Sequence, residues 1–156
     1  MRNLEVKILD SGFGLPLPKY ETEGAAGLDL FAATKEDTII IIPPRKAEMI
    51  PTGIAISVPP GYEAQIRPRS GLAAKNGITV LNSPGTIDSD YRGEILVMLI
   101  NHSNKDFEIL RGMRIAQMVI SKIEQFNLIS VDELDTTDRG KDGFGSTGIS
   151  IKKNEE

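Results

Sequence analysis

Residues 53–71 read GIAISVPPGYEAQIRPRSG, and this stretch decides the fold. Apolar side chains alternate with other residues over residues 54–58 and again over residues 62–66, which is the period-two pattern of half-buried β-strands. A Pro-Pro-Gly turn separates the two runs and leaves no room for the crossover helix that parallel neighbours need. The sequence therefore predicts antiparallel strands.

Similar patterns extend along the chain in both directions. Residues 4–8 (LEVKI) alternate in the same way. Residues 38–42 (TIIII) and 95–100 (ILVMLI) are continuous apolar runs of strand length, which predicts strands covered on both faces. Residues 114–123 (RIAQMVISKI) fit either a helix or a strand, and their neighbours favour a strand.

The helical candidate in the middle of the chain is short. Residues 70–77 read SGLAAKNG, with Ser70 as a possible N-cap. The predicted fold class is therefore all-β, a distorted jelly roll or β-sandwich with one short helix. After Leu134 the chain becomes polar and Gly-rich. We expect a jelly-roll domain over residues 1–134 and a flexible C-terminal arm over residues 135–156.

Composition and charge narrow the function classes. The chain has 156 residues, a formal net charge of -4 and no cysteine. The negative charge argues against a surface that grips a nucleic-acid backbone, and the lack of cysteine removes thiolate nucleophiles and Cys-based metal sites. The N-terminal residues form no signal-peptide core, and no apolar run reaches the roughly 20 residues that span a bilayer. We expect no membrane partner and a cytoplasmic location.

Residues 67–71 (RPRSG) combine two arginines, a hydroxyl group and a glycine just before the expected helix. Backbone amides at a helix N-terminus and a guanidinium group both favour a bound phosphate. The same residues also fit a capped helix with solvated arginines. Spacing alone does not decide between these two interpretations.

Residues 139–148 (RGKDGFGSTG) have the composition of a phosphate-binding loop. They lack the Gly-Lys-Ser/Thr ending of a P-loop and follow no strand-to-helix pattern, so a P-loop NTPase is excluded. A solvated tail is the simplest interpretation, but an aromatic residue, Phe144, stands between two glycines. Stacking on the base of a ligand would give this ring a role.

Several polar residues are candidates for catalysis or ligand binding. Asp88 and Asp90 lie in NSPGTIDSDYRGE, which is also compatible with a structural hairpin. Asp29 and Gln117 each interrupt an apolar strand, and a carboxylate there needs a cationic partner. The single histidine, His102, is in a polar turn, so the chain can build neither a Ser-His-Asp triad nor a His-based zinc site. The remaining groups suit metal-assisted attack of water on a phosphate.

Five stretches follow one another from Ala26 to Gly148: AGLDLFA, PRSGLA, NSPGTIDSDYRGEI, RGMRIAQM and RGKDGFGSTG. Together and in this order they resemble the motifs of the trimeric dUTP pyrophosphatases. The resemblance implies Mg²⁺-dependent hydrolysis of dUTP to dUMP and pyrophosphate. It also implies a jelly-roll homotrimer whose active sites are shared between subunits.

The resemblance implies roles for individual residues of the third motif. Asp88 matches the carboxylate that activates the attacking water, and Tyr91 matches the ring beneath the deoxyribose that rejects a 2′-hydroxyl group. Asn82 matches a polar contact to uracil, and a tight hairpin there can present backbone groups to the base while excluding the methyl group of thymine. The further pocket lining that we expect is Gly85, Thr86, Ile87 and Leu96.

Phosphate and metal contacts are implied in the other motifs. Gln117 matches an amide that contacts phosphate or the catalytic water, and Asp29 matches an acid that acts on the metal indirectly, through bound water. The phosphate-binding turn matches Arg69, Ser70 and Gly71. The C-terminal arm, which reaches another subunit's site and covers uracil and phosphates, matches Arg139, Phe144, Gly145, Ser146 and Thr147.

Two alternatives stay open. A dCTP deaminase of the same fold would use a glutamate to activate water against the cytosine ring, but the tyrosine of SDYRG and the GFGSTG arm favour the pyrophosphatase. A non-catalytic nucleotide-binding jelly roll would keep the pocket for sensing or assembly. Because every residue needed for turnover is present, a dUTP pyrophosphatase is the favoured prediction.

Overall fold

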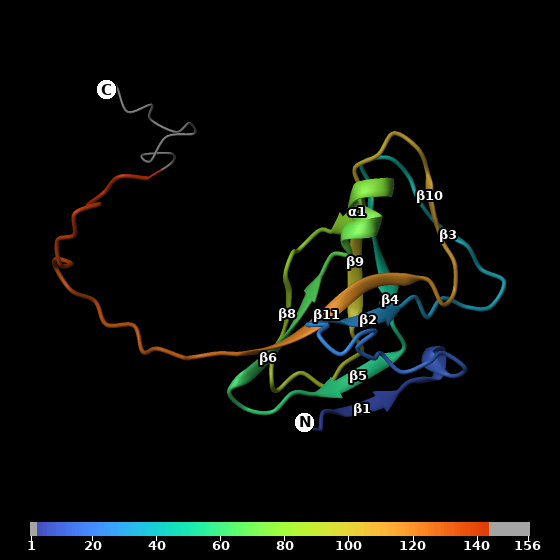
Figure 1. Cartoon of the computed structure of the whole chain (residues 1–156), viewed down its shortest axis with the longest axis horizontal. Helices are drawn as coiled ribbons and strands as arrows, with labels where there is room; N and C mark the ends of the chain where they lie inside the picture. The colour runs from blue at the N-terminus through green and yellow to red at the C-terminus, as the bar shows by residue number, and fades with distance from the viewer. Residues whose placement is uncertain (1–2, 144–156) are drawn as a thin grey trace. The chain divides into compact units, whose positions relative to one another are not determined.

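The computed structural model describes residues 3–143 (Figure 1). Within this range the chain forms eleven β-strands, one 3₁₀ helix and one α-helix. In chain order they are β1 (Glu5–Ile8), η1 (Asp10–Gly12), β2 (Leu28–Phe31), β3 (Ile40–Ile42), β4 (Ala47–Pro51), β5 (Ile54–Ser57), β6 (Tyr62–Arg67), α1 (Ser70–Asn76), β7 (Ile78–Val80), β8 (Gly85–Ile87), β9 (Leu96–Asn101), β10 (Phe107–Ile109) and β11 (Arg114–Lys122).

The strands of the described range form four sheets. The largest has the order β2-β11-β6-β8, and a three-stranded sheet has the order β4-β9-β7. Two smaller sheets pair β1 with β5 and β10 with β3. Each of these pairings is antiparallel, which confirms the prediction made from the short connections. The predicted all-β class is confirmed as well.

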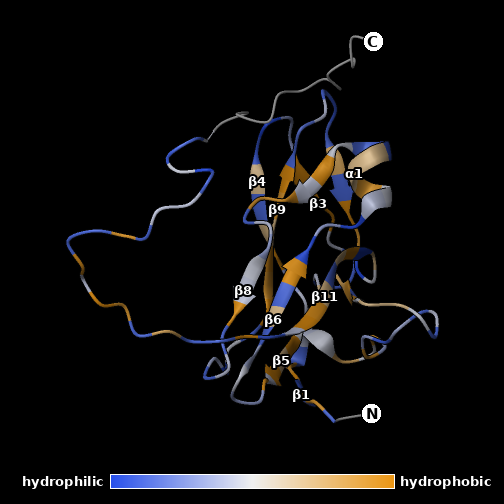
Figure 2. Cartoon of the chain, turned by 60° about the vertical axis from the view of Figure 1, so that its left-hand side comes forward, coloured by the Kyte–Doolittle hydropathy of each residue, from blue (hydrophilic) through white to orange (hydrophobic). Residues whose placement is uncertain are grey.

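One hydrophobic core joins the sheets. Its members include Leu30 of β2, Val97 and Leu99 of β9, and Ile115 and Met118 of β11, which are all buried. Figure 2 shows that hydrophobic residues concentrate on the strands. Packing of these side chains from separate sheets removes their apolar surface from water, and this burial is the main favourable term in folding.

Two strand predictions are confirmed in detail. β6 buries Ala64 and Ile66 and leaves Arg67 exposed, as the alternation over residues 62–66 predicts. The ambiguous run 114–123 is a strand, β11, at the centre of the largest sheet. β11 carries Gln117 and lies between β2, which carries Asp29, and β6, which leads into the turn with Arg69, Ser70 and Gly71.

The prediction of double-sided burial is wrong for two apolar runs. In the run 38–42, Ile39 and Ile41 are each 51% exposed, and in the run 95–100, Leu96 is 44% exposed. The second face of β3 is exposed at Ile41, and that of β9 is exposed at Leu96 and half-buried at Met98 and Ile100. A continuous apolar run predicts a strand, but it does not show how much of each face the rest of the chain covers.

The helix forms where predicted, with a different cap. The N-cap of α1 is Arg69, whose backbone is extended, whereas Ser70 is the first helical residue. The Ser70 hydroxyl cannot act as the cap because its own backbone is already helical. Gly77 ends the helix with φ 66°, a left-handed conformation that glycine adopts without steric cost.

The chain divides into two units, residues 1–124 and 125–156. The strands and helices of the described range all lie in the first unit, and residues 125–143 form none. The boundary at residue 134 and the arm over residues 135–156 stay predictions. None of the described residues belongs to a helix that is long and apolar enough to cross a membrane.

Candidate active site

A bend at residues 81–84 leads from β7 into β8, the edge strand of the largest sheet. The structural hairpin expected over NSPGTIDSDYRGE does not form, because β7 pairs with β9 and β8 pairs with β6. β8 pairs with β6 on one side and has no strand on its other side among the described residues. An edge strand leaves alternate N–H and C=O groups free, so Gly85–Ile87 can offer backbone donors and acceptors to a ligand. Asn82 is exposed and lies against this strand, since a Cβ on Gly85 would be 3.1 Å from Asn82 Nδ2.

Asp88 directly follows this edge strand and is exposed. The backbone turns immediately after it, because the Tyr91 N–H donates to the Asp88 carbonyl at 3.2 Å. The Arg92 guanidinium closes the same turn through Nη1, which donates to the carbonyls of Ser89 at 2.7 Å and Tyr91 at 2.8 Å. Asp88 and Tyr91 are therefore held one turn apart.

The Tyr91 ring is fixed by the two residues that end the turn. Its hydroxyl group donates to the Glu94 carbonyl at 2.9 Å. A Cβ on Gly93 would overlap the phenol group, so glycine is required for the ring to lie where it does. These contacts orient a side chain that is still 43% exposed and can meet a ligand.

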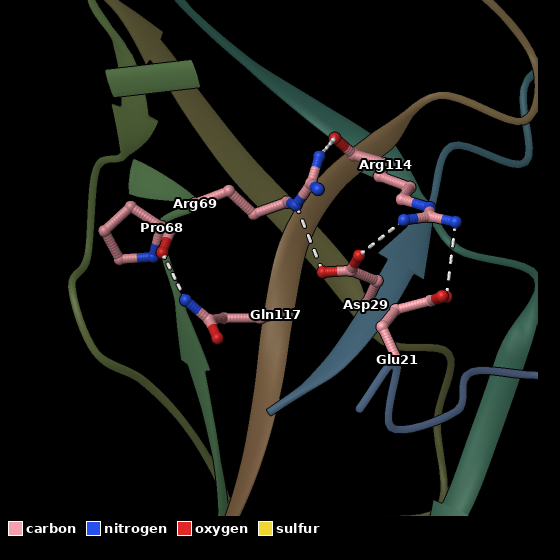
Figure 3. Close-up of polar contacts among 6 residues, drawn as sticks. All are labelled: Glu21, Asp29, Pro68, Arg69, Arg114 and Gln117. Carbon is pink, nitrogen blue, oxygen red and sulfur yellow. Dashed lines mark hydrogen bonds and ion pairs between the residues drawn. The ribbon is translucent and has the colours of Figure 1, made fainter. Parts of the chain in front are cut away.

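A second group of candidates gathers around Asp29 on β2 (Figure 3). The Asp29 carboxylate accepts ion pairs from Arg69 Nε at 3.1 Å and from Arg114 Nη1 at 3.3 Å. Arg114 also pairs with Glu21 at 3.2 Å, and Arg69 Nη1 donates to the Arg114 carbonyl at 3.0 Å. The prediction that a strand carboxylate at position 29 needs a cationic partner is confirmed, with two arginines in that role.

Gln117 lies beside Asp29 on the neighbouring strand, because the register of β11 pairs these two residues. Its Nε2 donates to the Pro68 carbonyl at 2.9 Å (Figure 3). A Cβ on Gly27 would overlap the Gln117 amide oxygen, so the glycine permits this side-chain position. The Gln117 amide is therefore oriented from two sides.

The turn from β6 into α1 has the groups expected of an anion site. Arg69 is anchored through Nε and Nη1, whereas its Nη2 has no partner among the described residues. Ser70 and Gly71 follow it, and both are exposed. The first amides of a helix have no intrahelical acceptor, so they and the Arg69 Nη2 can donate to a ligand oxygen.

The two groups of candidates lie on one sheet without meeting. β6 separates β8 from β11, and Gln117 pairs with Arg67 at one end of β6 while Ile87 pairs with Ala64 nearer the other end. Asp88 follows Ile87. Within one chain, about four residues of strand (roughly 13 Å) and two strand spacings of about 5 Å each separate Asp88 from Gln117. One copy therefore does not bring Asp88 to Gln117.

The remaining candidates are placed elsewhere. Leu96 begins β9 in the three-stranded sheet, opposite Pro51, and pairing does not join it to β8. Arg139 lies in the second unit, where its Nε donates to the Asp142 carbonyl at 2.9 Å. The arm candidates that lie outside the described residues are Phe144, Gly145, Ser146 and Thr147.

Sequence reasoning missed several residues that hold the site together. Arg114 could have been found, because RGMRIAQM places it three residues before Gln117 on the same strand. Glu21, Gly27 and Glu94 act through contacts that no local pattern indicates. Their partners depend on strand register and loop packing.

Comparisons with known proteins show the family of the chain. A family model described as dUTPase matches residues 14–148. The deoxyuridine 5'-triphosphate nucleotidohydrolase of Rhizobium rhizogenes is 57% identical over 141 residues, which cover 90% of this chain and 90% of the relative.

Solved structures show the same fold. A mutant dUTPase of Staphylococcus bacteriophage 80alpha with dUpNHpp has a TM-score of 0.84 at 26% identity, covering 96% of this chain and 100% of that chain. A mutant dUTPase from phage phi11 of S. aureus, described with a structural Mg(II) ion, has a TM-score of 0.74 at 23% identity, covering 85% of this chain and 98% of that chain. The predicted jelly roll is confirmed by this likeness.

Proposed function

The chain belongs to the dUTPase family and is a dUTP diphosphatase, and we propose that it cleaves dUTP by Mg²⁺-assisted attack of an Asp88-activated water on the α-phosphate. The products are dUMP and pyrophosphate. The observation that carries the proposal is the position of Asp88, an exposed carboxylate that directly follows an edge strand and lies one turn from the Tyr91 ring.

The backbone of the edge strand β8 recognises the base of the nucleotide. The free backbone groups of Gly85–Ile87 can pair with the hydrogen-bonding edge of uracil, and the Asn82 amide adds a side-chain contact. Close approach of this backbone leaves no room for the 5-methyl group of thymine. The Tyr91 ring lies beneath the deoxyribose and rejects a 2′-hydroxyl group by contact. Leu96 completes the apolar lining.

Asp88 acts as the general base for the attacking water. A positioned base of this kind contributes about 10²–10⁴ in rate. The carboxylate accepts a proton from the water while the water oxygen bonds to the α-phosphorus. The bond between the α-phosphorus and the α,β-bridging oxygen then breaks, and pyrophosphate leaves.

The Arg69 turn and Gln117 hold the phosphates. The free Nη2 of Arg69 and the amides at Ser70 and Gly71 donate to phosphate oxygens, and Gln117 contacts a phosphate or the attacking water. Preorganised donors stabilise the charge that develops during cleavage. The resemblance supports a further cover over the base and phosphates, formed by Arg139 and the arm residues Phe144, Gly145, Ser146 and Thr147.

Mg²⁺ is the proposed cofactor, and the donor set of the chain fits an ion that arrives with the nucleotide. Within residues 3–143, no three His, Cys, Asp or Glu side chains gather into a ready-made cage. Mg²⁺ usually keeps several waters and binds through substrate phosphates and one or two carboxylates. Asp29, beside Arg69, would hold the ion indirectly through water. When bound, Mg²⁺ neutralises charge on the triphosphate as pyrophosphate leaves.

The proposed assembly is a homotrimer with shared active sites. Two observations support it. Asp88 and Gln117 lie far apart within one chain, so a site that needs both takes them from different copies. The outer face of β4 and β9 is also apolar, with Met49 55% and Leu96 44% exposed, and a partner copy would cover it.

A substrate panel tests the proposed function. The chain is incubated with Mg²⁺ and dUTP, dCTP, UTP or dTTP, and pyrophosphate and ammonia are measured. We expect pyrophosphate from dUTP alone. Ammonia from dCTP would identify a deaminase, and tight dUTP binding without turnover would identify a nucleotide sensor. A cytoplasmic location stays a prediction from the sequence.

A further inference from the structure

We infer that Glu94 is a positioning residue that sets the discrimination between deoxyribose and ribose. It does so by holding the Tyr91 ring in place, and the inference therefore rests on the proposed role of Tyr91 beneath the sugar. No property of the Glu94 side chain is needed for the proposed chemistry itself. The contacts of this side chain all lead away from the site.

The Tyr91 ring depends on the Glu94 backbone for its position. The Tyr91 side chain is 43% exposed, so core packing does not fix it. Its hydroxyl group is instead tied to the Glu94 carbonyl at 2.9 Å, and the ring lies against Gly93. The position of the Glu94 carbonyl therefore sets the position of the phenol group.

The Glu94 side chain is itself anchored. Its Oε1 accepts the Gly53 N–H at 2.8 Å and the Ser11 hydroxyl at 3.4 Å. The next residue, Ile95, donates its N–H to the Ile54 carbonyl at 2.9 Å. The Thr52 hydroxyl also donates to the Ile95 carbonyl at 2.7 Å. The end of the Tyr91 turn is thus fastened beside β5 by three hydrogen bonds to residues 52–54, and one of them depends on the Glu94 carboxylate.

The anchor point is rigid. Gly53 has φ 69° and its backbone packs so closely on Gly12 that a Cβ on either residue would overlap the other. The Gly53 carbonyl accepts the Leu9 N–H at 2.8 Å. Arg111 Nη1 donates to the carbonyls of Ser11 at 2.8 Å and Thr34 at 2.7 Å, which fixes the η1 turn.

These contacts make sugar selection sensitive to Glu94. Loss of the carboxylate leaves the Gly53 N–H without its acceptor and removes one of the three hydrogen bonds that fasten the end of the turn to residues 52–54. A small shift of the ring opens space for a 2′-hydroxyl group, whereas Asp88, at the far end of the turn, keeps its place after β8. Loss of the Glu94 carboxylate should therefore raise kcat/KM for UTP by a larger factor than it lowers kcat/KM for dUTP.

The test compares kcat/KM for dUTP and UTP in the full chain with Mg²⁺. We expect Glu94→Ala to lower the dUTP/UTP ratio by about tenfold or more, the range in which a pocket discriminates one small group. Glu94→Gln keeps the oxygen acceptor and the shape, so it should retain the wild-type ratio. Glu108→Ala, on the exposed side of β10, is the control for loss of a glutamate.

A double-mutant cycle with Tyr91→Phe makes the test specific. Tyr91→Phe removes the hydroxyl group that meets the Glu94 carbonyl, so adding Glu94→Ala to it should change the ratio much less than Glu94→Ala does alone. An unchanged ratio in Glu94→Ala, or an equal loss with both nucleotides, would overturn the inference. A wild-type chain that does not hydrolyse dUTP would instead overturn the proposed function.

Discussion

At the scale of single residues, glycines allow functional side chains to take their positions. Gly27 and Gly93 each leave room for one side chain of the site, the Gln117 amide and the Tyr91 ring respectively. Neither glycine has a left-handed backbone, so the reason for glycine is space rather than conformation. Glycine has no side chain that could react or bind, so the role of these two residues becomes visible only in the folded chain.

Gly27→Ala should displace the Gln117 amide and lower kcat for dUTP by about tenfold to a hundredfold, since small misplacements of positioning groups have effects of this size. Gly24→Ala is the matched control, because a Cβ there meets nothing within 4 Å. Steady-state kinetics and thermal melts of both variants check the prediction. Equal kcat in the two folded variants would contradict it.

Asp88→Asn should lower kcat by at least about 10²-fold and leave dUTP affinity within a few-fold of wild type, because asparagine keeps the size of the side chain but cannot accept the proton. Single-turnover kinetics and calorimetric titration with dUTP separate the two effects. Asp90→Asn, an exposed carboxylate two residues away, should stay active. Normal turnover in Asp88→Asn would remove Asp88 as the base.

At the scale of elements, β4 and β9 carry a surface that one chain leaves uncovered. Met49 on β4 pairs with Met98 on β9, and Pro51 pairs with Leu96. The opposite face of β9 presents Val97 and Leu99 to the core. β9 thus has one apolar face packed in the core of its own chain and a second face that the proposed assembly would cover.

Met49→Lys should prevent assembly, because burying an unpaired charge between copies costs several kcal/mol. Sedimentation velocity should show a shift from trimer to monomer, with loss of dUTP turnover. Glu48→Lys is the control, since adjacent side chains on a strand point to opposite faces. A Met49→Lys variant that still sediments as wild type would exclude this face from the interface.

Element types were predictable from the sequence, and their burial was predictable only in part. Alternation over residues 62–66 identified β6, and the Pro- and Gly-rich turns identified antiparallel pairing. The runs 38–42 and 95–100 were assigned to strands correctly but to double-sided burial incorrectly. An apolar run in the sequence shows that a strand is hydrophobic, but it does not show how much of each face the rest of the chain covers.

At the scale of the whole molecule, the proposed site depends on contacts that the sequence could not locate. The need for a cation beside Asp29 was predictable from the cost of a strand carboxylate, but its partners Arg69 and Arg114 depend on the register of β11 and β6. The Glu94 contact to Gly53 joins the residues before β9 to the connection between β4 and β5, and it follows no local pattern. The order of the motifs in the sequence identified the family. The register of the strands determined which side chains lie beside one another in the folded chain.

Mixing two inactive variants tests the sharing of sites between copies. Asp88→Asn and Gln117→Ala are denatured together and refolded at equal amounts. If Asp88 and Gln117 of one site come from different copies, random mixing restores intact pairs in about one quarter of sites, given closed cyclic symmetry. Recovery of about a quarter of wild-type turnover is expected. No recovery in mixed trimers would place both residues of a site in one copy.

The central claim is that the turn after β8 reads the pyrimidine and directs water at the α-phosphorus. The most direct measurement is a crystal structure of the full chain with Mg²⁺ and a non-hydrolysable dUTP analogue. We predict uracil bonded to the backbone of Gly85–Ile87, the Tyr91 ring beneath the sugar and one water between Asp88 and the α-phosphorus. A nucleotide bound elsewhere, or an Asp88 carboxylate turned away from the α-phosphate, would contradict the claim.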